Sequence, residues 1–240
     1  MARYLTHTVQ TFYMKVSFLI PCYNEEDMIR RAHKQLRDAC KKLKLDYEII
    51  LEQDGSTDKT GEIISDLTKK DRRVVSLSFT DRKGKGWGLQ QAFNESNGDI
   101  IVFVDADMPF DMGYLGRLLE ETKNSDVVIA SRYLGSRRKL PMMRVITSRI
   151  YNLINRALFG IRVRDTQSSM QLFRKEVLKK VGSWPDGFEY NVWVLARASR
   201  LGFSIIEIGV PYEHRKGGKF SMGKHGMKTL IRTLKLATRV

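Results

Sequence analysis

The chain is poor in the residues that build disulfide frameworks and metal fingers. Of its 240 residues only Cys22 and Cys40 are cysteine, and its four histidines follow no ligand spacing. These absences exclude a small disulfide-stapled secreted domain and a zinc-finger module. A hydrophobic share of 42% with a charged share of 29% indicates a folded protein. We expect it to reside in the reducing cytoplasm.

Long apolar runs are also missing. No stretch approaches the roughly 18 uninterrupted apolar residues of a membrane span, so the sequence predicts no transmembrane helix. The segment from Met1 to Lys15 lacks the apolar core of a secretory signal. We interpret residues 1–13 as an N-terminal arm.

Acidic residues are scarce in the second half of the chain. Between Ala130 and Lys180 the only acids are Asp165 and Glu176, and the formal net charge of the whole chain is +15. Such an excess favours a polyanionic partner, whether nucleic acid, an anionic membrane or a phosphorylated substrate. No nucleic-acid-binding motif is present, and the basic residues do not alternate with a regular aromatic series. We therefore expect no nucleic-acid partner.

Apolar runs of strand length alternate with helical patterns along the first half of the chain. This alternation predicts an α/β fold with a doubly wound sheet and helices on both faces. The predicted strands cover 16–20, 47–51, 74–79, 100–104 and 126–131, and the predicted helices end near Lys42 and Lys69 or cover 89–95 and 112–123. Asn24 and Asp27 resemble a helix-capping pair, and the glycine-rich run 84–88 is predicted to be a loop.

Two carboxylates one residue apart follow the apolar strand 100–104. In open α/β sheets, ligands bind outside the carboxyl ends of the strands. Asp105 and Asp107 would therefore stand at the mouth of a cleft. Paired carboxylates suit Mg²⁺ or Mn²⁺ bound together with substrate phosphates. An ordinary acidic turn explains the pair equally well when it is taken alone.

Other strand ends carry groups that suit a nucleotide. Tyr23 could flank a base, and Glu25 or Asp54 could accept hydrogen bonds from base or ribose groups. Each signal is weak alone, because Asp54-Gly-Ser-Thr-Asp58 is also a favourable turn sequence. The run 84–88 lacks the spacing of a known phosphate-binding loop.

Two later segments have amphipathic helical patterns with basic residues. Apolar positions recur from Met143 to Ala157 and again from Met227 to Ala237. Packing of the apolar stripe against the core is the commoner role for such a helix, and we expect it for 143–157. A basic amphipathic helix can instead lie in a membrane interface.

Taken together and in order, the strand-end motifs resemble glycosyltransferase family 2, whose fold is the GT-A fold, a Rossmann-like mixed sheet. The later motifs resemble its polyprenyl-phosphate sugar synthases, such as the dolichyl-phosphate mannose synthases. The resemblance covers roughly Lys15 to Lys224. It is carried by Pro21-Cys-Tyr-Asn-Glu25, Asp54-Gly-Ser-Thr-Asp58, Gly84-Lys-Gly86, Asp105-Ala-Asp107, Ser131-Arg-Tyr133, Arg144 with Ser148, Asp165-Thr-Gln-Ser168, Phe173-Arg174, Val210-Pro211 and Arg215-Lys-Gly-Gly-Lys219.

The resemblance implies a role for each matching residue. Asp105 and Asp107 would hold Mg²⁺ or Mn²⁺ on the donor diphosphate, and Arg132, Arg144 and Ser148 would contact the acceptor phosphate. Asp107, Arg132, Arg144 and Arg215 would form the catalytic group. The nucleotide sugar would be bound by Pro21, Tyr23, Glu25, Asp54, Lys85, Asp105, Ala106 and Lys219, with Lys224 competing for the role of Lys219.

The implied reaction is an inverting, metal-dependent transfer of a hexose to a dolichyl or polyprenyl phosphate at the cytoplasmic membrane face. Mannose from GDP-mannose is our first expectation. UDP-glucose as donor is an alternative, as is a glycan or protein hydroxyl as acceptor, which would need a base such as Glu189 or Asp165. Residues 14–134 would bind the nucleotide sugar, and residues 135–240 of the same domain would bind the acceptor.

The sequence also departs from the family pattern. Ser169 replaces a frequent glycine, and Pro109 stands where some mannose synthases carry a further polar metal ligand. Asn191 and Trp193 replace acids of related glucosyl enzymes. These departures bear on substrate identity more than on reaction class. Attachment to an anionic membrane would come from the basic helices, from a small membrane subunit or from spans beyond Val240.

Overall fold

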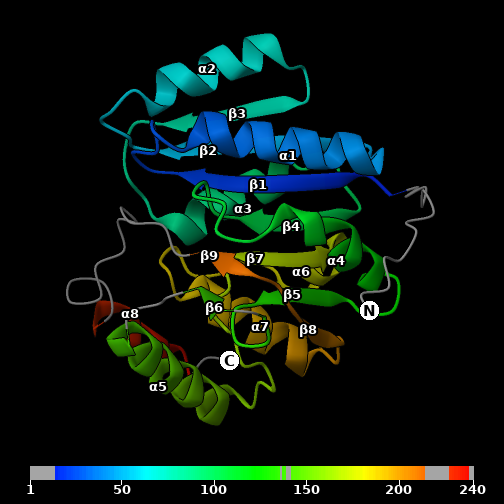
Figure 1. Cartoon of the computed structure of the whole chain (residues 1–240). Helices are drawn as coiled ribbons and strands as arrows, with labels where there is room; N and C mark the ends of the chain where they lie inside the picture. Colours follow the sequence, from blue (N-terminus) through cyan, green and yellow to red (C-terminus); the bar gives the residue numbers. More distant parts are fainter. Residues whose placement is uncertain (1–13, 136, 139–141, 214–226, 238–240) are drawn as a thin grey trace.

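The computed structural model describes residues 14–135, 137–138, 142–213 and 227–237. A seven-stranded sheet forms the centre, with the strand order β3-β2-β1-β4-β7-β5-β8 (Figure 1). Its strands are β1 (Val16–Cys22), β2 (Tyr47–Asp54), β3 (Val74–Phe79), β4 (Ile100–Val104), β5 (Val127–Ser131), β7 (Met170–Arg174) and β8 (Ile205–Gly209).

All neighbouring pairs in the sheet are parallel except those made by β7. This strand is inserted between β4 and β5 and runs antiparallel to both. The sheet is therefore mixed, and the predicted fold class is confirmed. The backbone N–H of Asp105 continues the ladder by donating to the carbonyl of Ser169, at 3.2 Å. Residues that precede β7 thus reach the edge where β4 and β5 end.

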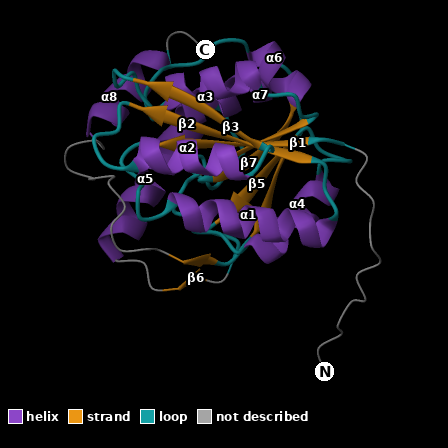
Figure 2. Cartoon of the chain, turned by 90° about the horizontal axis from the view of Figure 1, so that it is seen from above, coloured by secondary structure: helices purple, strands orange, loops and turns teal. Residues whose placement is uncertain are grey.

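Helices cover both faces of the sheet (Figure 2). One apolar core lies between the sheet and α1 (Ile29–Leu43), α2 (Thr60–Lys70) and α4 (Leu115–Glu121), which follows the short helix η1 (Met112–Tyr114). The other lies between the sheet and α3 (Lys85–Glu95), α6 (Lys175–Val181) and α7 (Tyr190–Arg200). Strands β4 and β5 are buried at every position, as continuous apolar runs require when both faces are covered.

Two local predictions were wrong. Helix α3 begins at Lys85, although the run 84–88 was predicted to be a loop. Gly86 and Gly88 therefore lie inside the helix. The helix packs so closely there that a Cβ at either position would lie 2.0–2.2 Å from a neighbouring atom, which explains the need for glycine. Asn24 does not cap α1; its side-chain oxygen instead accepts a hydrogen bond from the backbone N–H of Thr57, at 2.7 Å.

Helices α5 (Met142–Phe159) and α8 (Met227–Leu236) lie beside each other outside the two layers (Figure 1). The hydroxyls of Tyr151 and Thr233 join them at 2.7 Å. A small sheet of β6 (Arg137–Arg138) and β9 (Tyr212–Glu213) completes this part.

The prediction that the apolar stripe of α5 faces the core was wrong. Ile146, Ile150 and Leu153 are between 44% and 64% exposed. The inner side of the helix is polar instead, because Asn152 and Asn155 are buried in hydrogen bonds with Thr166. On α8, Ile231 and Leu234 are likewise about half exposed, whereas Thr229 and Thr233 are buried.

Candidate active site

The parallel strands β1, β2 and β4 end at one edge of the sheet, and most of the predicted donor-binding residues lie there. Pro21 is near the end of β1, Asp54 is the last residue of β2, and Asp105 directly follows β4. Tyr23 and Glu25 occupy the turn after β1, and the backbone N–H of Glu25 donates to Thr60 Oγ1 at 2.7 Å.

Lys85 and Asp105 form the central ion pair of this edge. Lys85 Nζ lies 2.5 Å from Asp105 Oδ1, and the Lys85 side chain is largely buried. Burial alone would lower the pKa of Lys85, but the carboxylate of Asp105 more than compensates, so the pKa is raised well above its usual value. The ammonium group is therefore a permanent positive charge at the carboxyl edge of the sheet.

The carboxylates at this edge suit a divalent cation whose remaining ligands come from substrate phosphates. Asp105 and Asp107 follow β4 directly, and Ala106 between them is buried. Among the described residues no group of three or more acids, cysteines or histidines forms a complete metal cage. Mg²⁺ and Mn²⁺ need no such cage, because one or two carboxylates plus substrate phosphates suffice. Asp105 already faces one cation, Lys85, which shows that this carboxylate is placed to balance positive charge.

Asp54 holds the turn that leads into α3. Its two carboxylate oxygens accept hydrogen bonds from the backbone N–H groups of Lys83 and Gly84, at 2.6 and 2.8 Å. Each oxygen keeps a second lone pair, so the predicted contact with a nucleoside remains compatible with this geometry. Arg82 from the same turn places its guanidinium 3.6 Å from the centre of the Tyr23 ring. The sequence held no signal for this stacking.

Glu52 was missed by the sequence reasoning. Its side chain is completely buried, and within the described part of the chain neither carboxylate oxygen has a hydrogen-bond partner. It packs against Gly88, where an added Cβ would lie 2.2 Å from Glu52 Oε2. Burial, together with the negative charge of Asp54, raises the pKa of Glu52 to about 8. The only signal available was an acid directly after the apolar run 49–51.

Arg132, a predicted acceptor ligand, is held by Asp165. Its Nε and one terminal nitrogen donate to the two carboxylate oxygens at 2.9 and 2.6 Å, and its backbone N–H donates to the same group at 2.9 Å. Although burial opposes the charge, Asp165 raises the pKa of Arg132. The same terminal nitrogen also donates to the carbonyl of Gln167.

The remaining predicted acceptor and donor residues are only partly described. Ser148 lies on α5, and its hydroxyl is hydrogen-bonded to the hydroxyl of Tyr133. Arg144 lies in the first turn of α5, and its side chain is outside the described residues, as are Arg215, Lys219 and Lys224 altogether. The structure therefore groups the residues at the ends of β1, β2 and β4, and it separately joins Arg132 to Asp165. The role of the basic C-terminal loop stays a prediction.

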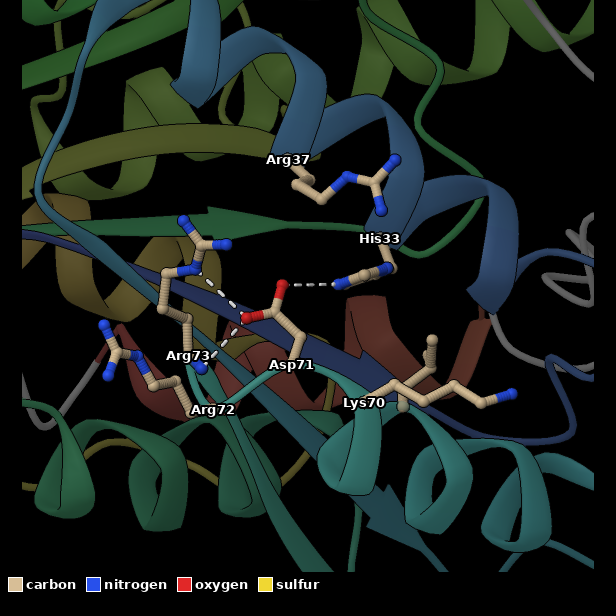
Figure 3. Close-up of a pocket in the computed structure, with 7 residues that line it drawn as sticks. His33, Arg37, Lys70, Asp71, Arg72 and Arg73 are labelled. Carbon is tan, nitrogen blue, oxygen red and sulfur yellow. Dashed lines mark hydrogen bonds and ion pairs between the residues drawn. The ribbon is translucent and has the colours of Figure 1, made fainter.

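A separate basic hollow of about 390 Å³ lies between α1 and α2 (Figure 3). Asp71 at its centre accepts from Arg73 Nε at 3.0 Å and lies 3.2 Å from His33 Nε2. Asp71 and Arg73 directly precede β3, so the hollow is at the amino ends of the strands. It is therefore not part of the candidate site, and Asp71 serves to join α1 to the start of β3.

Comparison with known proteins agrees with this geometry. The model for glycosyl transferase family 2 matches residues 17–182. Glycosyltransferase AglD of Haloferax volcanii is 31% identical over 219 residues, which cover 87% of this chain and 35% of the relative. A dolichol-phosphate mannosyltransferase of Pyrococcus furiosus is 33% identical over 211 residues, covering 86% of this chain and 58% of the relative. The chain thus spans between a third and three fifths of these two relatives.

A solved structure shows the same fold. The mannosyltransferase PcManGT from Pyrobaculum calidifontis, in complex with GDP-Man and Mn²⁺, superimposes with a TM-score of 0.67 at 18% identity, covering 96% of this chain and 66% of the other. The mixed sheet with a carboxylate pair at its carboxyl edge is therefore that of a GT-A glycosyltransferase. The chain belongs to glycosyl transferase family 2.

Proposed function

We propose that this protein is an inverting, metal-dependent glycosyltransferase that moves a hexose, foremost mannose from GDP-mannose, to a dolichyl or polyprenyl phosphate. The observation that carries the proposal is the Lys85–Asp105 ion pair at the carboxyl end of β4. A buried cation and a carboxylate suited to a metal lie together at this edge, which supports a role in binding the leaving diphosphate. The dolichol-phosphate mannosyltransferase among the relatives supports the choice of sugar and acceptor.

The donor side stabilises the leaving group. As the bond from the anomeric carbon to the donor phosphate breaks, negative charge grows on the diphosphate, and Lys85 offers fixed positive charge there. Mg²⁺ or Mn²⁺, when bound by Asp105 and Asp107, would supply further neutralisation. Tyr23 with its stacked Arg82, Pro21 and Asp54 border the place proposed for the nucleoside.

The acceptor side positions a nucleophile that is already charged. A phosphate monoester carries about −1.5 to −2 charge near neutrality, so its oxygen can form the new bond to the anomeric carbon without a general base. Arg132 suits this task because Asp165 holds its guanidinium in one orientation. We assign Arg144 and Ser148 to the same phosphate.

Helices α5 and α8 form the proposed membrane face, defined by the exposed Ile146, Ile150, Leu153, Ile231 and Leu234. Contiguous exposed apolar side chains mark an interaction surface. Helix α5 also carries the basic residues Arg149 and Arg156, which complement anionic lipid headgroups. Within the described ranges, every helix is too short or too polar to reach across a bilayer. We therefore propose attachment at the cytoplasmic membrane surface, with a small membrane subunit as the alternative anchor.

The rival acceptor, a sugar or protein hydroxyl, needs a general base. Both candidate bases are engaged elsewhere: Asp165 binds Arg132, and Glu189 is buried beside Arg232. This engagement favours the phosphate acceptor. The UDP-glucose donor remains the alternative within the same reaction class.

The test is a transfer assay with GDP-mannose and UDP-glucose in parallel, a short polyprenyl phosphate and either Mn²⁺ or Mg²⁺. We expect lipid-dependent and metal-dependent turnover of one donor, and loss of at least about 100-fold in the Asp107→Asn variant. Asp111→Asn, on the same loop, is the matched control and should retain turnover. Sugar transfer to a soluble glycan with none to the lipid phosphate would overturn the proposal.

A further inference from the structure

The segment from Trp184 to Tyr190, here called the bridge, lies between the donor side of the site and the C-terminal helix α8. It leads from α6 into the start of α7. Its backbone and side chains contact α3 at one end and Arg232 of α8 at the other. The bridge therefore connects the proposed membrane face with the proposed donor site.

On the donor side, the bridge and α3 are joined by hydrogen bonds and are closely packed. The carbonyl of Asp186 accepts from the backbone N–H groups of Gly86 and Trp87, at 2.7 and 3.2 Å. Trp184 Nε1 donates to the carbonyl of Gly86 at 2.8 Å. A Cβ on Gly86 would lie only 2.0 Å from the carbonyl oxygen of Pro185. A displacement of residues 184–186 would therefore disturb the first turn of α3 through these contacts.

Lys85 belongs to that first turn. Its Nζ lies 5.9 and 6.0 Å from the ring centres of Phe188 and Tyr190, both of which belong to the bridge. The same Nζ makes the 2.5 Å ion pair with Asp105. Two aromatic rings of the bridge thus lie near the ammonium group that we assign to the donor diphosphate.

On the α8 side, the contact is electrostatic. Glu189 is buried, and its Oε1 lies 3.5 Å from a terminal nitrogen of Arg232. Its Oε2 has no hydrogen-bond partner among the described residues. Gly187 permits this approach, because a Cβ there would lie 2.3 Å from Glu189 Oε2 and 2.6 Å from Arg232. A buried carboxylate with so few partners depends strongly on the cation beside it, Arg232.

We propose that Glu189 and Arg232 are positioning residues that couple the seating of α8 on a membrane to the placement of Lys85 at Asp105. The inference rests on the membrane attachment proposed above. When α8 lies on lipid, Arg232 is held in place, and through Glu189 it holds the bridge against α3. The enzyme then binds the donor more tightly at the membrane than in free solution, which restricts donor use to the place where the acceptor is found.

The chain carries its own reporter for this coupling. All three of its tryptophans lie along the connection: Trp87 on α3, Trp184 in the bridge, and Trp193 on α7. Trp193 Nε1 donates to the carbonyl of Ser183 at 3.2 Å. Intrinsic tryptophan fluorescence therefore follows this region without a label, donor or turnover.

The experiment titrates the full chain with vesicles of phosphatidylcholine and phosphatidylglycerol, and measures fluorescence, vesicle co-sedimentation and the Kd of GDP with Mn²⁺. Arg232→Gln is compared with Lys235→Gln, which removes the same charge from α8 but not the contact with Glu189. We expect vesicles to change the fluorescence and tighten nucleotide binding roughly 10-fold in the unmodified chain and in Lys235→Gln. Arg232→Gln should bind vesicles as Lys235→Gln does but lose both responses, and Arg232→Lys should restore part of them.

The variants also separate coupling from misfolding. In a Glu189→Gln background, the change Arg232→Gln should have little further effect on either response, because the pair is already broken. An Arg232→Gln variant that gains nucleotide affinity on vesicles as the unmodified chain does would overturn the coupling and leave membrane attachment intact. Failure of the unmodified chain to bind vesicles would overturn the attachment and the coupling together.

Discussion

Glu52 should make the stability of the fold depend on pH, and the Glu52→Gln variant isolates this effect. The carboxyl group is completely buried, lacks a hydrogen-bond partner in the described structure and has a pKa raised from 4.5 to about 8. Because the folded pKa is the higher one, the group is protonated in the folded protein at neutral pH. Its stabilising contribution is complete below the unfolded pKa and is lost as the pH rises towards 8.

The size of the effect follows from the two pKa values. Each pH unit between them withdraws about 1.4 kcal/mol of stability. Between pH 5 and pH 8 the unmodified chain should therefore lose about 4 kcal/mol relative to Glu52→Gln, which cannot ionise. This is a large share of the roughly 5–15 kcal/mol that stabilises an ordinary domain.

The assay is urea unfolding of both proteins, followed by far-UV circular dichroism at several pH values. All other titrating groups are shared, so the difference between the two free energies of unfolding isolates Glu52. We expect that difference to change steeply from pH 5 to pH 8 and to level off beyond. Two parallel curves across this range would refute the reasoning, because they would mean that Glu52 has an ordinary pKa in the folded protein.

Three further predictions concern the site. Gly88→Ala should destabilise the fold by about 2 kcal/mol, because the new Cβ would lie 2.2 Å from Glu52 Oε2; urea unfolding measures this, and an unchanged midpoint would contradict the close packing. Asp165→Asn should raise the KM for the lipid phosphate about 10-fold or more and leave the Kd of the nucleotide unchanged, because it releases the guanidinium of Arg132. A chelator should abolish the binding of GDP measured by calorimetry, and added Mn²⁺ should restore it. Binding that survives chelation would contradict the proposal that Asp105 and Asp107 hold a metal for the nucleotide.

The first half of the chain was predictable because its strands are local apolar runs. The predictions for 74–79 and 100–104 agree with β3 and β4 residue by residue. The carboxyl edge followed from the same reasoning, since parallel strands end together and Asp54 and Asp105 come at such ends. Lys85 was found only through the family resemblance, and the structure adds its ion pair with Asp105.

The second half was less predictable because its elements depend on distant partners. Strand β7 pairs with β4 and β5, which precede it by many residues, and no local pattern announces that insertion. The stripe of α5 was assigned to the core because helical periodicity reports an apolar face but not what covers it. The partners of Arg132 and Glu189 were equally hidden, since Asp165 and Arg232 lie 33 and 43 residues away.

The antiparallel course of β7 has a consequence for how this enzyme could diversify. Because β7 returns beside β4 and β5, the excursion that leaves the sheet after Ser131 comes back to it at the same edge. Its two ends are fastened there: Arg132 binds Asp165, and Ser168 Oγ donates to the carbonyl of Ala130 at 2.6 Å. A segment whose two ends are fixed beside the sheet can change in length and sequence with little effect on the sheet itself.

We therefore expect the excursion that includes α5 to vary more among family members than the sheet does. Because Arg144 and Ser148 of this excursion are proposed to bind the acceptor phosphate, replacing the excursion with that of another family member should change the acceptor and leave the Kd of the nucleotide unchanged. The Arg132–Asp165 pair thus lies where the part proposed to bind the acceptor joins the part proposed to bind the donor.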